Sequence, residues 1–250
     1  MISRNEIDNT YFVDPKETSK HKISVKGNSP RCSETLKYRD HALIGISPFN
    51  SRFSPGYVEE LLIWAHREFK SVDVLLPDND HAGLLLRATG VANDKAARKV
   101  RKELNRHTRT IKQVLEKMET CSAHTRIFEF SDFFDHPEYQ KLRAGVEAAY
   151  ENCGNFRAAC KEMSSQAING RITGTRPRSA DPAQRYGRID IAIPYIFAEL
   201  PFYLNSPSFT LKPTSTFLYH KIWPIGAALR EGRFPLEIDG KQAHGIVSLS

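Results

Sequence analysis

Short, nearly continuous apolar runs separated by helix-length segments are the feature that most limits how this chain can fold. Runs of this length, bounded by Gly, Pro or polar residues, are typical of strands buried on both faces. Because helical segments lie between them, the sequence predicts an α/β fold in which helices cover both faces of a parallel sheet. The runs are HALIGIS at 41–47, VDVLLPD at 72–78, TRIFEF at 125–130 and STFLY at 215–219.

The rest of the chain is assigned from periodicity and breaker residues. Residues 1–38 are polar and poor in aliphatic side chains, so we expect a mobile tail ahead of one folded domain at 39–250. The Gly-, Pro- and Arg-rich segment at 170–187 predicts a long loop, and the run at 215–219 is expected to be the last core strand. Helices are predicted at about 56–70, 94–120, 137–169 with a break near Gly154, 195–203 and 224–231.

Composition narrows the class of protein further. With 250 residues, the chain can bury a full core in one domain. No apolar run approaches the roughly 18 residues of a membrane span, and the N-terminus lacks a hydrophobic signal core. The four cysteines have no CxxC or Cys/His spacing, so we expect a reduced, cytoplasmic protein without a metal site, with a zinc site as the alternative. A formal net charge of +7 and a pI near 9.2 favour a polyanionic partner.

The segment at 95–112 has one strongly basic face when it is drawn as a helix of about 100° per residue. Its apolar residues, among them Ala97, lie on the opposite side, and Asp94 and Glu103 are the only acids nearby. Charged helix faces are usually solvated and mix both signs, whereas this one favours a phosphate backbone. A solvated surface is the simpler alternative. The basic residues on this face are Lys95, Arg98, Lys99, Lys102, Arg106 and Arg109.

Ser47 follows the first apolar run, at the point where open α/β sheets bind their ligands. A serine at such a turn is most often a turn or capping residue. The GxSxG elbow is absent, and no His/Asp pair has the context of a triad. If Ser47 is a nucleophile, its target must therefore be an already activated ester.

Tyr195 and Glu199 lie on one face of a predicted helix, whose end we assign to Pro201. Glu199 is embedded in the apolar segment IFAELPF, where burial raises a carboxyl pKa unless a cation pairs with it. A substrate ammonium group would be such a cation, and an arginine or a backbone N–H is the alternative partner.

Three segments, GISPFN, YIFAELPF and STFLYH, together resemble the motifs of the cyclodipeptide synthases over about residues 42–230. The resemblance implies a Rossmann-like catalytic domain, spanning 39–250 here, which is related to class I aminoacyl-tRNA synthetases but performs no ATP chemistry and needs no cofactor. Asn50, Tyr219 and His220 match the Asn-Tyr-His subfamily. The residues that match the family motifs are Ser47, Asn50, Tyr195, Glu199, Tyr219 and His220.

The resemblance also implies a mechanism that consumes two aminoacyl-tRNAs. Ser47 would carry first an aminoacyl and then a dipeptidyl group, and cyclisation would release a diketopiperazine. Tyr195 and Glu199 would hold the amino group, Tyr219 would relay protons and His220 would position Tyr219. Asn50 would hydrogen-bond the bound aminoacyl group, with backbone N–H groups near Gly45 as an oxyanion site, and the basic helix would bind tRNA.

By position in the family, the pocket for the first side chain is apolar, which favours a hydrophobic amino acid. A non-catalytic tRNA-binding module and a small-molecule esterase that uses Ser47 are the competing interpretations. The predicted pocket residues are Leu43, Gly45, Val74, Phe202 and Phe217.

Overall fold

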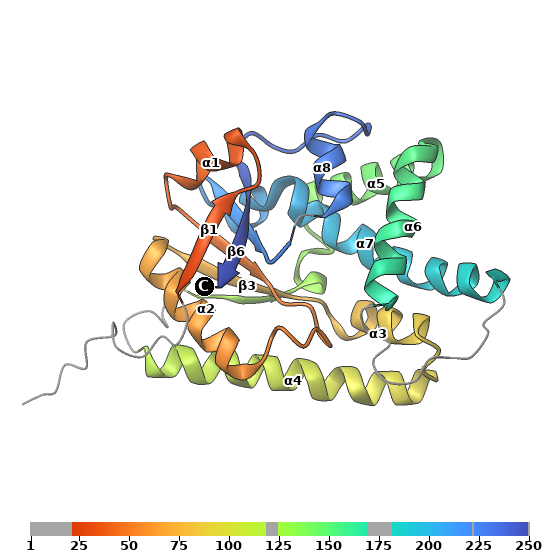
Figure 1. The fold of residues 1–250 in the computed structure, drawn as a ribbon, viewed down its shortest axis with the longest axis horizontal. Coiled ribbons are helices and arrows are strands. Elements are labelled where there is room, and N and C mark those ends of the chain that lie inside the picture. The colour runs from red at the N-terminus through yellow and green to blue at the C-terminus, as the bar shows by residue number, and fades with distance from the viewer. Residues whose placement is uncertain (1–21, 119–124, 170–181, 222, 250) are drawn as a thin grey trace, which may run out of the picture.

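The computed structural model describes residues 22–118, 125–169, 182–221 and 223–249, which form an open α/β sheet flanked by helices (Figure 1). Within these residues the strand order is β1-β6-β5-β2-β3-β4. Neighbouring strands from β6 to β4 run parallel, and β1 pairs antiparallel with β6 at one edge. The strands are β1 (Ile23–Gly27), β2 (Ala42–Gly45), β3 (Val72–Leu76), β4 (Ile127–Glu129), β5 (Ser215–Tyr219) and β6 (Gln242–Leu249).

Alternate residues of each strand face opposite helical layers, so the sheet has two apolar cores. On one face Leu43, Leu75 and Phe217 pack with residues of α5, α6, α7 and α8. On the other face Ile44 and Val74 pack with residues of α2 and α4. Figure 1 shows α4 along the lower side of the molecule and α5 to α8 toward its upper right. The helices are α1 (Pro30–Leu36), α2 (Pro55–Glu68), α3 (Asn79–Ala88), α4 (Asn93–Lys117), α5 (Pro137–Asn152), α6 (Gly154–Asn169), α7 (Pro182–Thr210) and α8 (Pro224–Arg230).

These features confirm the predicted fold class. The four apolar runs form β2, β3, β4 and β5, and the expected break near Gly154 separates α5 from α6. Local sequence explains several helix starts. Ser54 caps α2 through its side chain, which accepts a hydrogen bond from the backbone N–H of Tyr57, and Pro55 occupies the first turn.

The predicted boundary of the N-terminal tail is wrong. β1 and α1 lie inside residues 1–38, and β1 pairs with β6 from Ile23↔Leu249 to Gly27↔Gly245. The strand was missed because its side chains alternate between buried and exposed at the sheet edge, which leaves few aliphatic residues in its sequence. Residues 1–21 of the expected tail lie outside the described residues.

Three further differences concern elements that the apolar runs did not reveal. β6 follows β5, so the run at 215–219 is not the last core strand; parallel pairing with β5 stabilises β6. α3 fills the interval after β3, where Asp78 caps its first turn. Residues 182–187 belong to α7 and not to the predicted loop, whose remainder, 170–181, lies outside the described residues.

Pro201 does not end the helix that carries Tyr195. α7 continues through Pro194, Pro201 and Pro207, and the non-helical backbone occurs at Asn205 (φ −158°, ψ 61°). Each proline removes one backbone donor, but packing against α3, α5 and α6 keeps the segment helical.

A buried polar cluster links the amino-terminal ends of β2, β3, β4 and β5. Ser47 follows the opposite, carboxyl end of β2. Asp73 accepts hydrogen bonds from the backbone N–H of Arg126 at 2.9 Å and from its guanidinium at 2.6 Å, and His41 Nε2 lies 3.2 Å from the same carboxylate. Burial acts to raise the pKa of Asp73, but hydrogen bonds from His41 and Arg126 outweigh it and lower the pKa to about 2. His41 also contacts the hydroxyl of Ser215 at 2.9 Å. These side chains are closed to solvent apart from Arg126, so the cluster is structural.

Candidate active site

Two cavities meet at the carboxyl ends of β2 and β5. The larger has a volume of about 490 Å³ and opens between the loop after β2, α4, α6 and α7. The smaller, of about 40 Å³, lies against the ends of β2, β3 and β5. Side chains common to both cavities therefore mark the junction where a substrate would pass between them. They are Ser47, Phe53, Tyr195, Glu199, His220 and Trp223.

Ser47 reaches this junction because the sheet extends slightly beyond β2. The backbone N–H of Ile46 donates to the carbonyl of Leu75 at 3.0 Å, which continues the β2–β3 pairing up to the residue before Ser47. The chain then turns at Phe49, whose φ is 61°. Asn50 lines the larger cavity, and its Oδ1 accepts a hydrogen bond from the backbone N–H of Arg52 at 3.1 Å.

Tyr195 and Glu199 lie one turn apart on α7, on one face as predicted, and both line the two cavities. Their exposed fractions are 7% and 8%, so most of each side chain is removed from solvent. The ring of Phe130 packs against Tyr195 with a centroid distance of 5.6 Å. A carboxylate in such a place is suited to holding a cation that enters the junction.

Tyr219 ends β5 and brings a phenol to the same place. Its hydroxyl is buried and has no hydrogen-bond partner among the described residues. Burial raises the pKa of Tyr219 well above its ordinary value, and the charge of Glu199 raises it further. The phenol is therefore a neutral donor. Since buried hydroxyls are normally hydrogen-bonded, this group is suited to a partner that arrives with the substrate.

His220 is placed differently from the expectation that it positions Tyr219. No hydrogen bond joins it to the Tyr219 hydroxyl; instead it lines both cavities, with its ring edge-on to Phe53. Burial lowers the pKa of His220 to about 4, and the charges of Arg52 and Lys221 add to this effect. His220 is therefore a neutral imidazole near pH 7.

Of the five predicted pocket residues, one lines the smaller cavity and three lie in the core on the same side of the sheet. The first is Gly45, and the other three are Leu43, Phe202 and Phe217. A Cβ at Gly45 would lie 2.7 Å from Cε2 of Phe217, so the ring occupies the space that the absent side chain leaves.

Val74 is the exception, because it lies on the opposite face of the sheet among residues of α2 and α4. Its assignment to the pocket is wrong by one residue. Side chains alternate along a strand, so the neighbouring Leu75 faces the cavity instead. Phe130 also lines the cavity and was not predicted, although it directly follows β4 at the same edge of the sheet.

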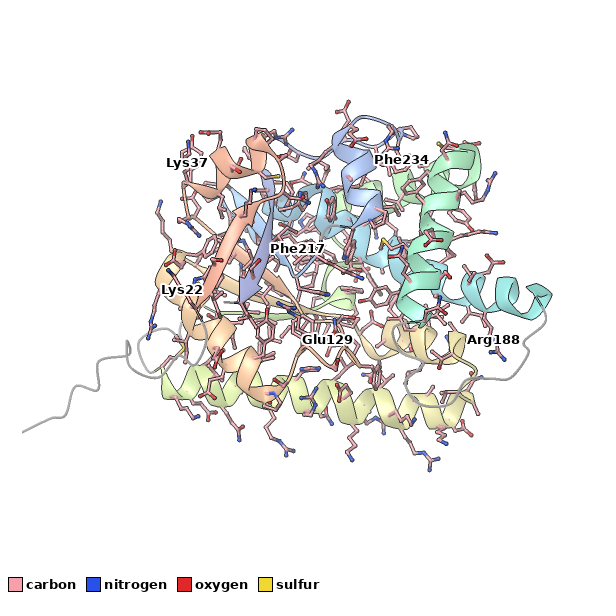
Figure 2. All side chains as sticks on the ribbon, in the orientation of Figure 1. Lys22, Lys37, Glu129, Arg188, Phe217 and Phe234 are labelled. Carbon is pink, nitrogen blue, oxygen red and sulfur yellow. The ribbon has the colours of Figure 1, made fainter. Side chains whose placement is uncertain are left out.

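The basic face of α4 is exposed as predicted at five of its six positions, and Figure 2 shows long side chains that project from α4 away from the sheet. Ala97 is exposed, and Ala96 is the alanine that packs inward. The sixth position, Arg106, is half-buried, lines the larger cavity and forms an ion pair with Glu103 at 2.7 Å. The exposed basic residues of the predicted face are Lys95, Arg98, Lys99, Lys102 and Arg109; three other basic residues of α4, Arg101, Lys112 and Lys117, are also exposed and were not among the predicted positions.

The described residues show no disulfide bond, metal-binding cluster or membrane-spanning helix. Cys32, Cys153 and Cys160 are free thiols, and Cys121 lies outside the described ranges. No group of three or more His, Cys, Asp or Glu side chains in this part of the chain could hold a metal ion. Nor does any helix there combine the length and apolar character needed to cross a membrane.

Comparison with solved structures first defines the class of this protein. A Mycobacterium tuberculosis structure that relates cyclodipeptide synthetases to type I tRNA synthetases superimposes with a TM-score of 0.78. It is 24% identical and covers 91% of this chain and 94% of that one, so the likeness shows the fold. A cyclodipeptide synthase from Bacillus thermoamylovorans is 32% identical with a TM-score of 0.83, covering 91% of this chain and 96% of that one.

Sequence comparison then defines the family. The family model described as cyclodipeptide synthase matches residues 23–249, so the chain belongs to the cyclodipeptide synthases, which are enzymes. It is 43% identical over 231 residues to a cyclo(L-leucyl-L-leucyl) synthase of Photorhabdus laumondii, covering 90% of this chain and 96% of that protein. A Bacillus subtilis protein of the same name is 38% identical over 220 residues, with coverage of 86% and 85%. The family suggested by the sequence motifs is thereby confirmed.

Proposed function

We propose that this cyclodipeptide synthase takes both amino acids from aminoacyl-tRNAs and carries them on Ser47. The observation that supports this proposal is the position of Ser47 at the junction of the two cavities, beside Glu199 and Tyr195. An aminoacyl ester is already activated, which matches a serine whose sequence context holds no triad. We also propose that the chain belongs to the Asn-Tyr-His subfamily, because Asn50, Tyr219 and His220 match its motif.

The first step is a transesterification. Ser47 Oγ attacks the carbonyl carbon of the first aminoacyl-tRNA, the bond from that carbon to the ribose oxygen breaks, and the serine proton ends on the ribose hydroxyl. The ester on Ser47 leaves its amino group beside Glu199 and Tyr195. Because only a neutral amine is nucleophilic, Glu199 accepts the ammonium proton before the next step.

Two aminolysis steps then complete the ring. The amine on Ser47 attacks the ester of a second aminoacyl-tRNA, which forms one amide bond and releases the second tRNA. The new terminal amine then attacks the Ser47 ester, which forms the second amide and returns the proton to Oγ. Tyr219 is a neutral phenol without a partner among the described side chains, so it can donate to the oxygen that leaves and recover the proton from the amine.

We further propose that leucine is the first amino acid. Leu75 and Phe130 line the smaller cavity, and Leu43, Phe202 and Phe217 lie in the apolar core on the same side of the sheet. None of these five offers a charge or hydroxyl to a polar side chain. The relatives from Photorhabdus laumondii and Bacillus subtilis are both named cyclo(L-leucyl-L-leucyl) synthases. The larger cavity is lined by both polar and apolar side chains, so a second leucine is proposed from the names of these two relatives alone.

The exposed basic residues of α4 would bind tRNA phosphates, since cationic side chains bind nucleic acid mainly through its backbone. Charged tRNA as the substrate places the reaction in the cytoplasm. The product, a diketopiperazine, would enter secondary metabolism.

The test is the mass of the intact protein after incubation with leucyl-tRNA. We expect the gain of one leucyl residue on Ser47, and its loss in Ser47→Ala, which should keep its fold. Cyclo(Leu-Leu) in the medium of cells that express the chain should disappear with the same substitution. Binding of tRNA without product would indicate the tRNA-binding module, and turnover of aryl esters without use of charged tRNA would indicate the esterase.

A further inference from the structure

Glu103 and Arg106 differ from the rest of the basic face of α4 because they point toward the loop that carries Ser47. Nη2 and Nε of Arg106 donate to the two carboxylate oxygens of Glu103 at 2.7 and 3.0 Å, which is a bidentate pair. Pairs of this kind hold both side chains in one geometry. The fully buried His107 lies beneath, with Nε2 3.1 Å from Arg106 Nη2. Both members of the pair line the larger cavity together with Ser47.

The pair also contacts the loop backbone on either side of Asn50. The Glu103 carboxylate accepts a hydrogen bond from the backbone N–H of Phe49, which contributes to lowering the pKa of Glu103 after the larger effect of Arg106. The Arg106 guanidinium donates to the carbonyl oxygen of Phe53 at 3.4 Å. The backbone N–H of Phe49 and the carbonyl of Phe53 therefore both hydrogen-bond to α4, within six residues of Ser47 in the chain.

Phe49 shows that the loop does not adopt this shape by its own preference. Its φ of 61° lies in the left-handed region, which is unfavourable for a bulky side chain and persists only where surrounding contacts impose it. Its ring packs against a small core formed by α3 and α4, which includes Val100 and Leu104. This left-handed backbone at Phe49 begins two residues after Ser47. The contacts with α4 therefore determine how the loop runs and where it places the Ser47 hydroxyl.

We propose that Glu103 and Arg106 are positioning residues, which hold the loop at 47–54 so that Ser47 meets the ester of the bound aminoacyl-tRNA. This inference rests on the proposed acyl transfer to Ser47. It divides α4 into two functions: the exposed basic residues bind the tRNA, and the Glu103–Arg106 pair aligns the nucleophile. Arg106 then leaves the group of predicted tRNA-binding residues.

The division can be tested by kinetics of leucyl transfer from leucyl-tRNA to Ser47 in single-turnover reactions. We expect Arg106→Gln and Glu103→Gln to lower the rate at saturating leucyl-tRNA, on the order of 10- to 100-fold, because small misplacements of reacting groups cost this much. The half-saturating concentration should stay the same. The double substitution should lose no more than the larger single loss, since the two residues act as a unit.

Lys102→Gln and Arg98→Gln are the matched controls on the same helix, and both should raise the half-saturating concentration while leaving the rate at saturation in place. If Arg106→Gln behaves like these controls, Arg106 is a phosphate ligand and the inference is wrong. Unchanged kinetics in both pair variants would also overturn it.

Hydrogen exchange supplies a readout that does not depend on the reaction. The amides of 47–54 should exchange faster in Glu103→Gln and Arg106→Gln than in the controls, and equal exchange would refute the bracing role. If Glu103→Gln does not fold, the half-exposed Arg106→Gln carries the test alone. If the parent makes cyclodipeptide without ever carrying leucine on Ser47, the proposed mechanism fails. The exchange and the rate of product formation would still decide the role of the pair.

Discussion

Replacing Gly45 with alanine tests whether the ring of Phe217 occupies the space that the glycine leaves at the bottom of the active site. The new Cβ would lie 2.7 Å from Cε2 and 3.1 Å from Cζ of that ring, whereas carbon atoms in contact are about 3.5–4.0 Å apart. The ring is fully buried, so the clash displaces other core side chains, which costs about 1–3 kcal/mol. The lower entropy of the unfolded chain offsets only about 0.4–1 kcal/mol.

We therefore expect a net loss in the free energy of unfolding, measured by urea denaturation, and a Tm lower by about 2–4 °C for each kcal/mol lost. The smaller cavity should also shrink, so transfer of leucine to Ser47 should slow. In a background that carries Phe217→Leu, Gly45→Ala should cost less, with a coupling of about 0.5–3 kcal/mol. Unchanged stability in the single variant, or strict additivity in the double variant, would refute the steric reasoning.

Buried hydrogen-bonding groups and charges at the surface give three other predictions. Tyr219→Phe should raise the free energy of unfolding by up to about 1–3 kcal/mol, because it removes a buried hydroxyl that no described residue pairs with. The substitution should also slow cyclisation. A lower free energy of unfolding in the variant would contradict the assignment of the Tyr219 hydroxyl as buried and unpaired. Asp73 should stabilise the fold by about 2 kcal/mol above pH 4 and lose this contribution as the pH falls toward 2, since its folded pKa is lowered from 3.8 to about 2. Asp73→Asn should abolish that pH dependence of the free energy of unfolding. If the variant loses stability between pH 4 and 2 as the parent does, Asp73 is not the group responsible. Arg98→Glu with Lys102→Glu should weaken tRNA binding and flatten its salt dependence by about 0.7–0.9 in slope for each phosphate that is no longer neutralised. Equal slopes in both proteins would show that these residues touch no phosphate.

The main site residues were singled out by local rules, and their roles were predicted from the resemblance of three motifs to a known family. Ser47 and Tyr219 are near the carboxyl ends of buried strands, where parallel sheets place their ligands, and Tyr195 and Glu199 are one helical turn apart. Ser47, Tyr195 and Glu199 line both cavities and Tyr219 lines the smaller one, and this proximity follows once β2 and β5 are parallel neighbours. The motif spacing then pointed to the family that the comparisons confirm.

The errors have a common physical origin in contacts between distant segments. Val74 and Leu75 are both apolar, so the sequence could not tell which of them faces the cavity; the register against Ile44 and Gly45 decides it. β1 was taken for part of a tail because only its pairing with β6 makes a half-exposed segment into a strand. Arg106 was placed on the exposed basic face, although it is half-buried, because a helical wheel does not show the loop that packs against α4.

The sequence by itself determined the α/β class and the positions of most helices and strands, and it singled out Ser47, Tyr195 and Glu199, because periodicity, capping and strand ends are local properties and the motif spacing is read directly from the chain. Only the tertiary structure decided which face each strand residue presents, that β1 and β6 join the sheet, and that Glu103 and Arg106 turn toward the serine loop. These outcomes depend on which distant segments are neighbours, and that choice is made by the packing of the whole chain.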